Sequence, residues 1–173
     1  HVDFGKFTLV ETTPDYLMLA SYPRYGYFYE KDLQPMSLGL RDNSTGLWNK
    51  VAEDKIMPKT SIMKIDSDIE CVLLKNPIDS TEYTEYLYSI NGFDFLSKEL
   101  TEIATLTLPK DILNPHFDSK TREFSYARRY SSSSESIIEF RTVNVDTKEE
   151  RELKTFKIRN DSVMFYNPKI LWL

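Results

Sequence analysis

The chain has 173 residues, of which 40% are hydrophobic and 28% charged, a composition that argues against disorder and suffices for one domain with a buried core. Its formal net charge of -5 argues against a nucleic-acid partner, because an acidic protein repels phosphate backbones. Cys71 is the only cysteine, which excludes an intrachain disulfide and a thiolate zinc cluster.

Strands dominate the predicted secondary structure. The sequence contains 11 Tyr, 10 Phe and 2 Trp, and aromatic side chains favour pleated, half-buried surfaces. Alternation of polar and apolar residues defines the individual strands. In chain order the predicted strands are Phe7–Val10, Tyr16–Tyr22, Tyr25–Tyr29, Ser61–Ile65, Ile69–Leu74, Glu85–Ile90, Phe124–Tyr130, Ile137–Val145, Leu153–Ile158 and Val163–Tyr166.

Turns and helices are predicted at five places. Asp66-Ser67-Asp68, Asn91-Gly92 and Asp146-Thr147-Lys148-Glu149 have the composition of turns between paired strands. Leu47–Asp54 and Ser97–Ala104 are predicted as short helices, although the second segment also fits a strand.

A degenerate internal repeat is the most informative pattern. Four segments recur after about 53 residues: 15–20 at 68–73, 86–91 at 140–145, 98–108 at 148–158, and 114–117 at 167–170. The pattern predicts three units, approximately 4–58, 59–112 and 113–173, each a meander of four antiparallel strands. Regularly spaced hairpins in an unrepeated all-β protein would give similar matches, so both interpretations stay open.

The segment from Asn114 to Ile158 resembles a blade of the TolB or WD-like β-propellers in its pattern and spacing. It lacks the Gly-His and Trp-Asp pairs of the WD family. The resemblance implies blade-like units in a mainly β fold, either as a fragment or small relative of a propeller or packed as a sandwich or open barrel.

The residues that catalysis would need are scarce. A catalytic hypothesis would pair His116 with Cys71 as nucleophile and Asp118 as the orienting group, but alternation places Cys71 on a buried strand face. Asp66, Asp68 and Glu70 have the spacing of calcium ligands, yet the glycine and the final glutamate of a calcium loop are missing. We therefore expect no enzymatic activity, metal or cofactor.

Binding of a protein is the function that the sequence favours. Small, acidic, β-rich chains without catalytic motifs are similar in general character to bacterial toxin-immunity proteins of the contact-dependent inhibition type, which neutralise a basic partner such as a nuclease toxin. The resemblance implies tyrosine anchors and surface acids. The candidates are Tyr22, Tyr25, Tyr27, Asp66, Asp68, Glu70, Glu82 and Glu85.

The expected location is the cytoplasm. No apolar run approaches the roughly 20 residues that span a bilayer, and residues 1–23 contain acids where a signal peptide would be apolar. A removed leader stays open as an alternative. We also expect no membrane or nucleic-acid partner, because the aromatic and basic segment Tyr126–Tyr130 is short and lies in an acidic chain.

Overall fold

The structure is a computed structural model that describes residues 7–12, 14–21, 37–51, 56, 60–78, 84–131 and 135–159. Every regular element in these residues is a β-strand, which confirms the predicted mainly β fold. The strands form three sheets, and in each sheet the strands that follow one another in the chain lie side by side and antiparallel, apart from one short parallel addition.

The strand order is simple in all three sheets. The first sheet contains β1 (Phe7–Thr12), β2 (Tyr16–Ser21), β3 (Ser37–Asp42) and β4 (Trp48–Val51). The middle sheet contains β5 (Ser61–Met63), β7 (Cys71–Pro77), β8 (Glu85–Asp94) and β9 (Glu99–Pro109). The third sheet contains β10 (Ile112–Asp118), β11 (Glu123–Ser131), β12 (Glu135–Asn144), β13 (Glu150–Arg159) and the short β6 (Asp66–Ser67), which pairs parallel with β10.

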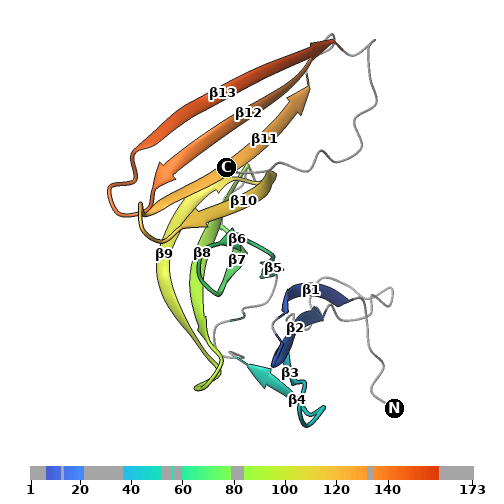
Figure 1. The fold of residues 1–173 in the computed structure, drawn as a ribbon. Coiled ribbons are helices and arrows are strands. Elements are labelled where there is room, and N and C mark those ends of the chain that lie inside the picture. Colours follow the sequence, from blue (N-terminus) through green and yellow to red (C-terminus); the bar gives the residue numbers. More distant parts are fainter. Residues whose placement is uncertain are drawn as a thin grey trace.

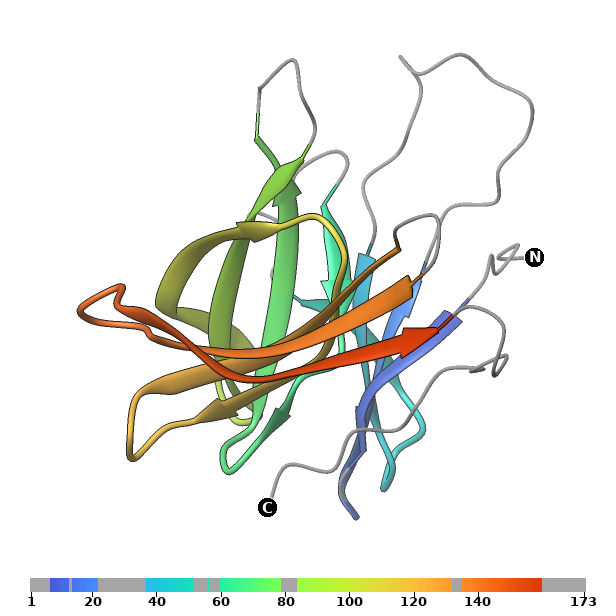
Figure 2. The ribbon, with the colours of Figure 1, turned by 90° about the horizontal axis from the view of Figure 1, so that it is seen from above.

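The three sheets follow one another along an arc (Figure 1). The strands of the third sheet cross those of the middle sheet at a steep angle (Figure 2). The middle sheet is buried on both faces, which explains why four consecutive residues of β7, Cys71–Leu74, are buried instead of alternating with exposed ones.

Two hydrophobic clusters join the sheets. One lies between the middle and third sheets: Ile65, Cys71, Leu73, Tyr88, Ile90, Ala104, Leu106, Leu108, Ile112, Phe117, Phe124, Tyr126, Val143 and Val145. The other lies between the first and middle sheets: Met18, Leu38, Leu40, Val51, Ile56, Ile62, Val72, Leu74, Phe93 and Leu100. Burial of this apolar surface, at about 25 cal/mol per Å², is the main force that holds the stack together.

The hairpin between the third and fourth strands has the same turn in all three sheets. The turns begin at Asp42, Asp94 and Asn144, whose side-chain oxygens accept hydrogen bonds from the amides two and three residues later. The amide four residues later donates to the backbone carbonyl of the same residue. That fourth residue has a positive φ (72° at Gly46 and 61° at Lys98), which reverses the chain within a short loop.

The β8–β9 and β12–β13 hairpins also share a β-bulge. Pairing shifts between Ile90 and Asn91 in the middle sheet, and between Phe140 and Arg141 in the third sheet. When the two hairpins are aligned at their bulges, the paired residues of one match those of the other position by position, and Ile90 in the middle sheet corresponds to Phe140 in the third. Each sheet is thus built mainly as an antiparallel meander, as the predicted fold class has it. The division of the chain into three units at the predicted bounds stays a prediction. A common repeat origin of the three sheets stays a prediction.

Three local predictions were wrong. Asn91-Gly92 is not a hairpin turn: both residues lie inside β8, and the chain reverses after Asp94. For Ser97–Ala104 the helix is wrong and the strand alternative is right from Glu99 onward: residues 97–98 lie in a turn, and β9 follows, with Leu100 and Ile103 packed on opposite faces of the sheet. In the predicted helix Leu47–Asp54, residues Trp48–Val51 form β4.

The remaining turn predictions had different outcomes. Asp146–Glu149 lies between β12 and β13, as predicted. Asp66 and Ser67 follow β5 but form β6, so the connection between β5 and β7 is longer than a tight turn. The predicted strands Tyr25–Tyr29 and Val163–Tyr166 lie outside the described residues.

Candidate binding surface

Two of the predicted binding residues, Asp66 and Asp68, connect the middle sheet to the third. Asp66 Oδ2 lies 3.2 Å from His116 Nδ1 on β10. Asp68 accepts hydrogen bonds of 2.8 Å from both the amide and the hydroxyl of Ser119, and these bonds hold the pKa of Asp68 below its usual value. Both carboxylates remain exposed, so they combine a structural contact with an accessible charge.

Glu70 and Glu85 are exposed at opposite ends of the middle sheet. Glu70 directly precedes β7, and Glu85 begins β8 and pairs with Pro109. At about 3.3 Å per residue, the length of β7 separates these ends by roughly 20 Å. The predicted acids therefore do not form one cluster.

Tyr22, Tyr25, Tyr27 and Glu82 lie outside the described residues. Their segments connect the second strand of a sheet to its third: residues 22–36 join β2 to β3, and residues 79–83 lie between β7 and β8. By connectivity, the tyrosines and Glu82 thus belong to corresponding connections of neighbouring sheets, and Glu85 is the first residue of the strand that follows the second connection.

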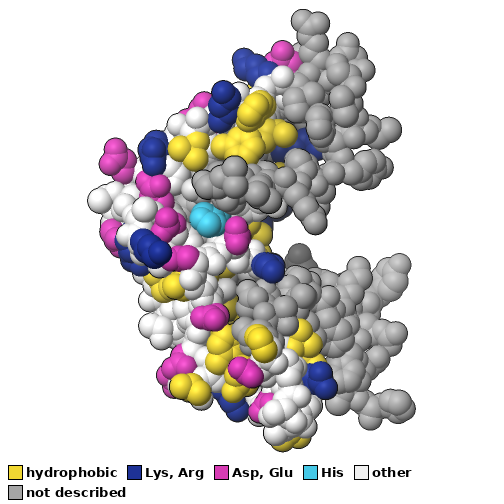
Figure 3. Space-filling model, viewed as in Figure 1, with side chains coloured by type: hydrophobic (Ala, Val, Ile, Leu, Met, Phe, Trp, Pro, Cys, Tyr) yellow, Lys and Arg dark blue, Asp and Glu magenta, His cyan; other side chains and the backbone are white. Residues whose placement is uncertain are grey.

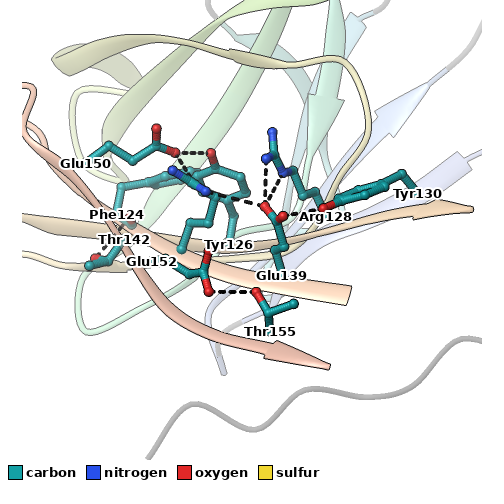
Figure 4. A network of polar contacts seen from close by, with 10 residues as sticks. Phe124, Tyr126, Arg128, Tyr130, Glu139, Thr142, Glu150, Glu152 and Thr155 are labelled. Atoms are coloured by element: carbon teal, nitrogen blue, oxygen red, sulfur yellow. Dashed lines mark hydrogen bonds and ion pairs between the residues drawn. The ribbon is translucent and has the colours of Figure 1, made fainter. Parts of the chain in front are cut away.

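A network of charged and phenolic side chains lies on the face of the third sheet that also contacts the middle sheet (Figure 4). Glu139 of β12 is its centre: its carboxylate receives hydrogen bonds from Arg128, Arg141 and Tyr130. Arg141 also donates to Glu150 over 2.7 Å. The network arises because the register places Arg128 directly opposite Glu139 and Tyr126 opposite Arg141.

Burial and pairing fix the charges of this network. The hydrogen bond from Tyr130 is the largest influence that lowers the pKa of Glu139, and the same bond raises the pKa of Tyr130. Burial raises the pKa of Tyr126, and its bond to Glu150 raises it further. The acids are therefore ionised and the tyrosines neutral at neutral pH, which makes the network a preorganised polar surface.

The network adjoins the end of the middle sheet that carries Glu85. The amide of Lys110 donates to the carbonyl of Thr84, which holds Glu85 beside Lys110 and Asp111. Asp111 precedes β10, whose first residue lies opposite Arg128. We call the surface formed by Glu85, Lys110, Asp111, Arg128 and Tyr130 the connection end. Tyr130 is 44% exposed there.

The connection end combines two carboxylates, those of Glu85 and Asp111, with the basic side chains of Lys110 and Arg128 and an exposed tyrosine. The described residues of segment 60–111 include eight carboxylates and four lysines, whereas those of 112–159 include eight carboxylates and ten basic residues. Charges of both signs are interspersed on the described part of the face drawn in Figure 3. A surface of charged side chains bordered by an exposed tyrosine is suited to recognising a protein.

The catalytic hypothesis receives no geometric support at His116. Its imidazole lies against Asp66, whereas the Asp118 carboxylate accepts hydrogen bonds from the amides of Lys120 and Thr121. Cys71 is buried in the core between two sheets. Among the described residues, no three His, Cys, Asp or Glu side chains are grouped so that they could hold a metal ion.

The sequence did not reveal the Arg128–Glu139 network. Its members are separated by up to 24 positions and meet only through the strand register. A comparison with protein-family models, curated proteins and solved structures finds no match. No helix that could cross a membrane occurs in the described ranges.

Proposed function

We propose that the chain is a non-enzymatic protein-binding domain that holds a basic protein partner, such as a nuclease toxin, at the connection end. The proposal rests on two backbone contacts: the bond between Lys110 and Thr84 brings Glu85 close to Asp111, and Ile112, the next residue, lies opposite Arg128, two positions before exposed Tyr130. Carboxylates steer a basic partner to the surface, and an aromatic side chain supplies apolar contact area at little entropic cost.

The rigidity of the surface supports the same proposal. Tyr130 and Arg128 are both held by Glu139, so their side-chain orientations are fixed before a partner arrives. A preordered contact surface binds more tightly because less conformational entropy is lost on association. Glu82 belongs to the connection that leads to Glu85, and Tyr22, Tyr25 and Tyr27 belong to the corresponding connection of the first sheet. These four residues are therefore candidates for further contacts with the partner.

The experiment uses the full chain as bait. Proteins of the source organism that the immobilised chain retains are purified, and their affinities are measured by calorimetry at low and high salt. We expect Glu85→Lys with Asp111→Lys to weaken binding of a basic partner by on the order of tenfold or more at low salt, with less effect at high salt.

The matched control is Glu70→Lys with Glu99→Lys, which makes the same charge change away from the connection end. Equal affinity of both double variants for the partner would contradict a binding site at the connection end. Retention of acidic proteins only would contradict a basic partner.

A second candidate is an interaction scaffold of the β-propeller type. The observation that favours it is the turn that all three meanders share, together with the bulge shared by the middle and third sheets. On such a scaffold the exposed Tyr130 would contribute more to recognition of the partner than the carboxylates of Glu85 and Asp111. Tyr130→Ala would then abolish partner binding while the Glu85 and Asp111 variants left it intact.

A further inference from the structure

The long strand β9 forms one edge of the middle sheet. Among the described strands, β9 pairs only with β8, so the backbone groups on its other side are not part of a ladder. Residues 103–109 of this strand, Ile-Ala-Thr-Leu-Thr-Leu-Pro, contain no charged side chain. An uncharged edge of residues that favour strands is a template on which a strand of another chain can pair. Soluble proteins therefore protect such edges.

The register shows which backbone groups of β9 point to this edge. The amide of Lys110 donates to the carbonyl of Thr84 over 2.9 Å, so these two residues form a hydrogen-bonded pair. Hydrogen-bonded and non-hydrogen-bonded pairs alternate along antiparallel strands, and the register continues without a shift as far as the bulge. Thr107 and Thr105 therefore lie in non-hydrogen-bonded pairs, and their N–H and C=O groups point away from β8.

A lysine of the third sheet occupies one of these outward groups. Lys148, in the turn between β12 and β13, donates from Nζ to the carbonyl of Thr105 over 2.8 Å. The turn lies next to β9 in the ribbon view (Figure 1). The same ammonium donates to the carbonyl of Val145 over 2.7 Å, which holds it in place. A strand that paired with β9 would need the Thr105 carbonyl as an acceptor and would bury the ammonium, which is costly.

The long edge strand of the third sheet is protected in a different way. In β13, six of the ten residues are charged: Glu150, Arg151, Glu152, Lys154, Lys157 and Arg159. Charged side chains along an edge oppose pairing with another chain, because pairing would bury them. Since β9 has no such charges between residues 103 and 109, its protecting charge comes from the neighbouring sheet.

We infer that Lys148 prevents β9 from pairing with β9 of a second copy of this chain. Removal of the ammonium leaves the outward carbonyl of Thr105 beside the outward groups of Thr107, and two copies then pair through these edges. The inference rests on contacts between the middle and third sheets. It is independent of the proposed function, because Glu85 and Asp111 are not involved.

Lys148→Met tests the inference on the full chain, because methionine keeps an unbranched side chain without the charge. Light scattering after size-exclusion chromatography should give a mean mass at least about twice that of the wild type, as expected for pairing of two edges. Lys148→Arg retains a charged donor and should keep the wild-type mass. Lys98→Met makes the same change at the corresponding position of the β8–β9 turn and should also keep that mass.

A second substitution shows whether the β9 edge makes the contact. Thr107→Pro removes an outward N–H without the loss of a bond to β8, and proline is tolerated at such positions of edge strands. Added to Lys148→Met, it should return the mass to the wild-type value. Thr107→Lys, which places a charge at this exposed position, replaces it if circular dichroism shows that the proline variant is unfolded.

Hydrogen exchange gives an independent readout at the same residue. In the associated Lys148→Met protein, the amide of Thr107 should exchange about tenfold or more slowly than in the wild type, because it pairs with the second copy. Equal masses of Lys148→Met and the wild type would overturn the inference. So would association that persists in folded double variants with either substitution at Thr107, because another surface would then make the contact.

Discussion

Arg128 and Glu139 lie directly opposite each other on β11 and β12, with Arg128 Nη2 2.6 Å from Glu139 Oε2. The Glu139 side chain is only 10% exposed, and a second arginine, Arg141, contacts the same carboxylate oxygen. One largely buried acid therefore contacts two arginines in the third sheet, of which Arg141 is also paired with Glu150.

Removal of this acid should destabilise the protein. We expect Glu139→Ala to lower the free energy of unfolding by about 2 kcal/mol, because it leaves two partly buried arginines and Tyr130 without their shared acceptor. Urea denaturation followed by fluorescence measures the change. The exposed Glu149→Ala is the control and should change stability by less than about 0.5 kcal/mol. Equal effects of the two substitutions would contradict the role of Glu139.

Acid should destabilise the fold through its turn and loop aspartates. Hydrogen bonds hold the pKa values of Asp42, Asp68, Asp94 and Asp118 below the usual 3.8. A depressed pKa means that the folded state binds fewer protons than the unfolded state. The resulting stability is therefore fully present above about pH 5 and is lost as the pH falls through 3.8 and below.

Asp68→Asn tests this linkage at one position, because asparagine retains an acceptor for Ser119 but does not titrate. Thermal melts from pH 7 to pH 3 should show a smaller loss of Tm in this variant than in the wild type. Glu70→Gln is the neighbouring control and should follow the wild-type curve. A wild-type Tm that did not fall below pH 4 would contradict the prediction.

The hydroxyl of Tyr88 should contribute to stability from inside the core. Tyr88 is fully buried, and its hydroxyl donates to the carbonyl of Lys110 over 2.7 Å, where the chain passes from β9 to β10. Tyr88→Phe should cost about 1 kcal/mol, because a part-buried hydrogen bond is lost while the Lys110 carbonyl keeps Lys75 Nζ as a donor. The half-buried Tyr86→Phe should cost less, as measured by denaturation. A smaller cost at Tyr88 than at Tyr86 would argue against this bond.

The hairpin turns predict opposite effects of one substitution at two positions. Lys98→Gly should stabilise the fold by about 0.5 kcal/mol, because glycine adopts the observed φ of 61° without strain. Lys148→Gly should destabilise it, because Lys148 Nζ also donates to the carbonyls of Thr105 and Val145. Gly46→Ala should cost about 1 kcal/mol at its φ of 72°. Equal changes at Lys98 and Lys148 would show that the Nζ contacts contribute nothing.

Pattern and propensity were sufficient for most strands but misplaced one turn. Asn91-Gly92 has the composition of a tight turn, yet Asn91 is buried and its amide donates to Ser89 within the middle sheet. The turn forms instead where Asp94 accepts two backbone amides and Lys98 takes a positive φ. An aspartate or asparagine at the start of each such turn was the available signal.

Partners across strands were beyond the reach of the sequence. The alternation in β11 shows which residues share a face, but not that Arg128 meets Glu139 or that Asp68 meets Ser119. These contacts depend on register and on packing between sheets, which depend on all the strands together.

The amino-acid sequence by itself determined the mainly β class, the positions of most strands and the burial of Cys71, because period-two alternation and aromatic content act locally along a strand. Only the tertiary structure decided that the middle sheet is covered on both faces and that Phe156 and Trp48 remain exposed at the two ends. The physical reason is that a strand's own sequence specifies which side chains are apolar, whereas the sheet that packs against them comes from a distant part of the chain.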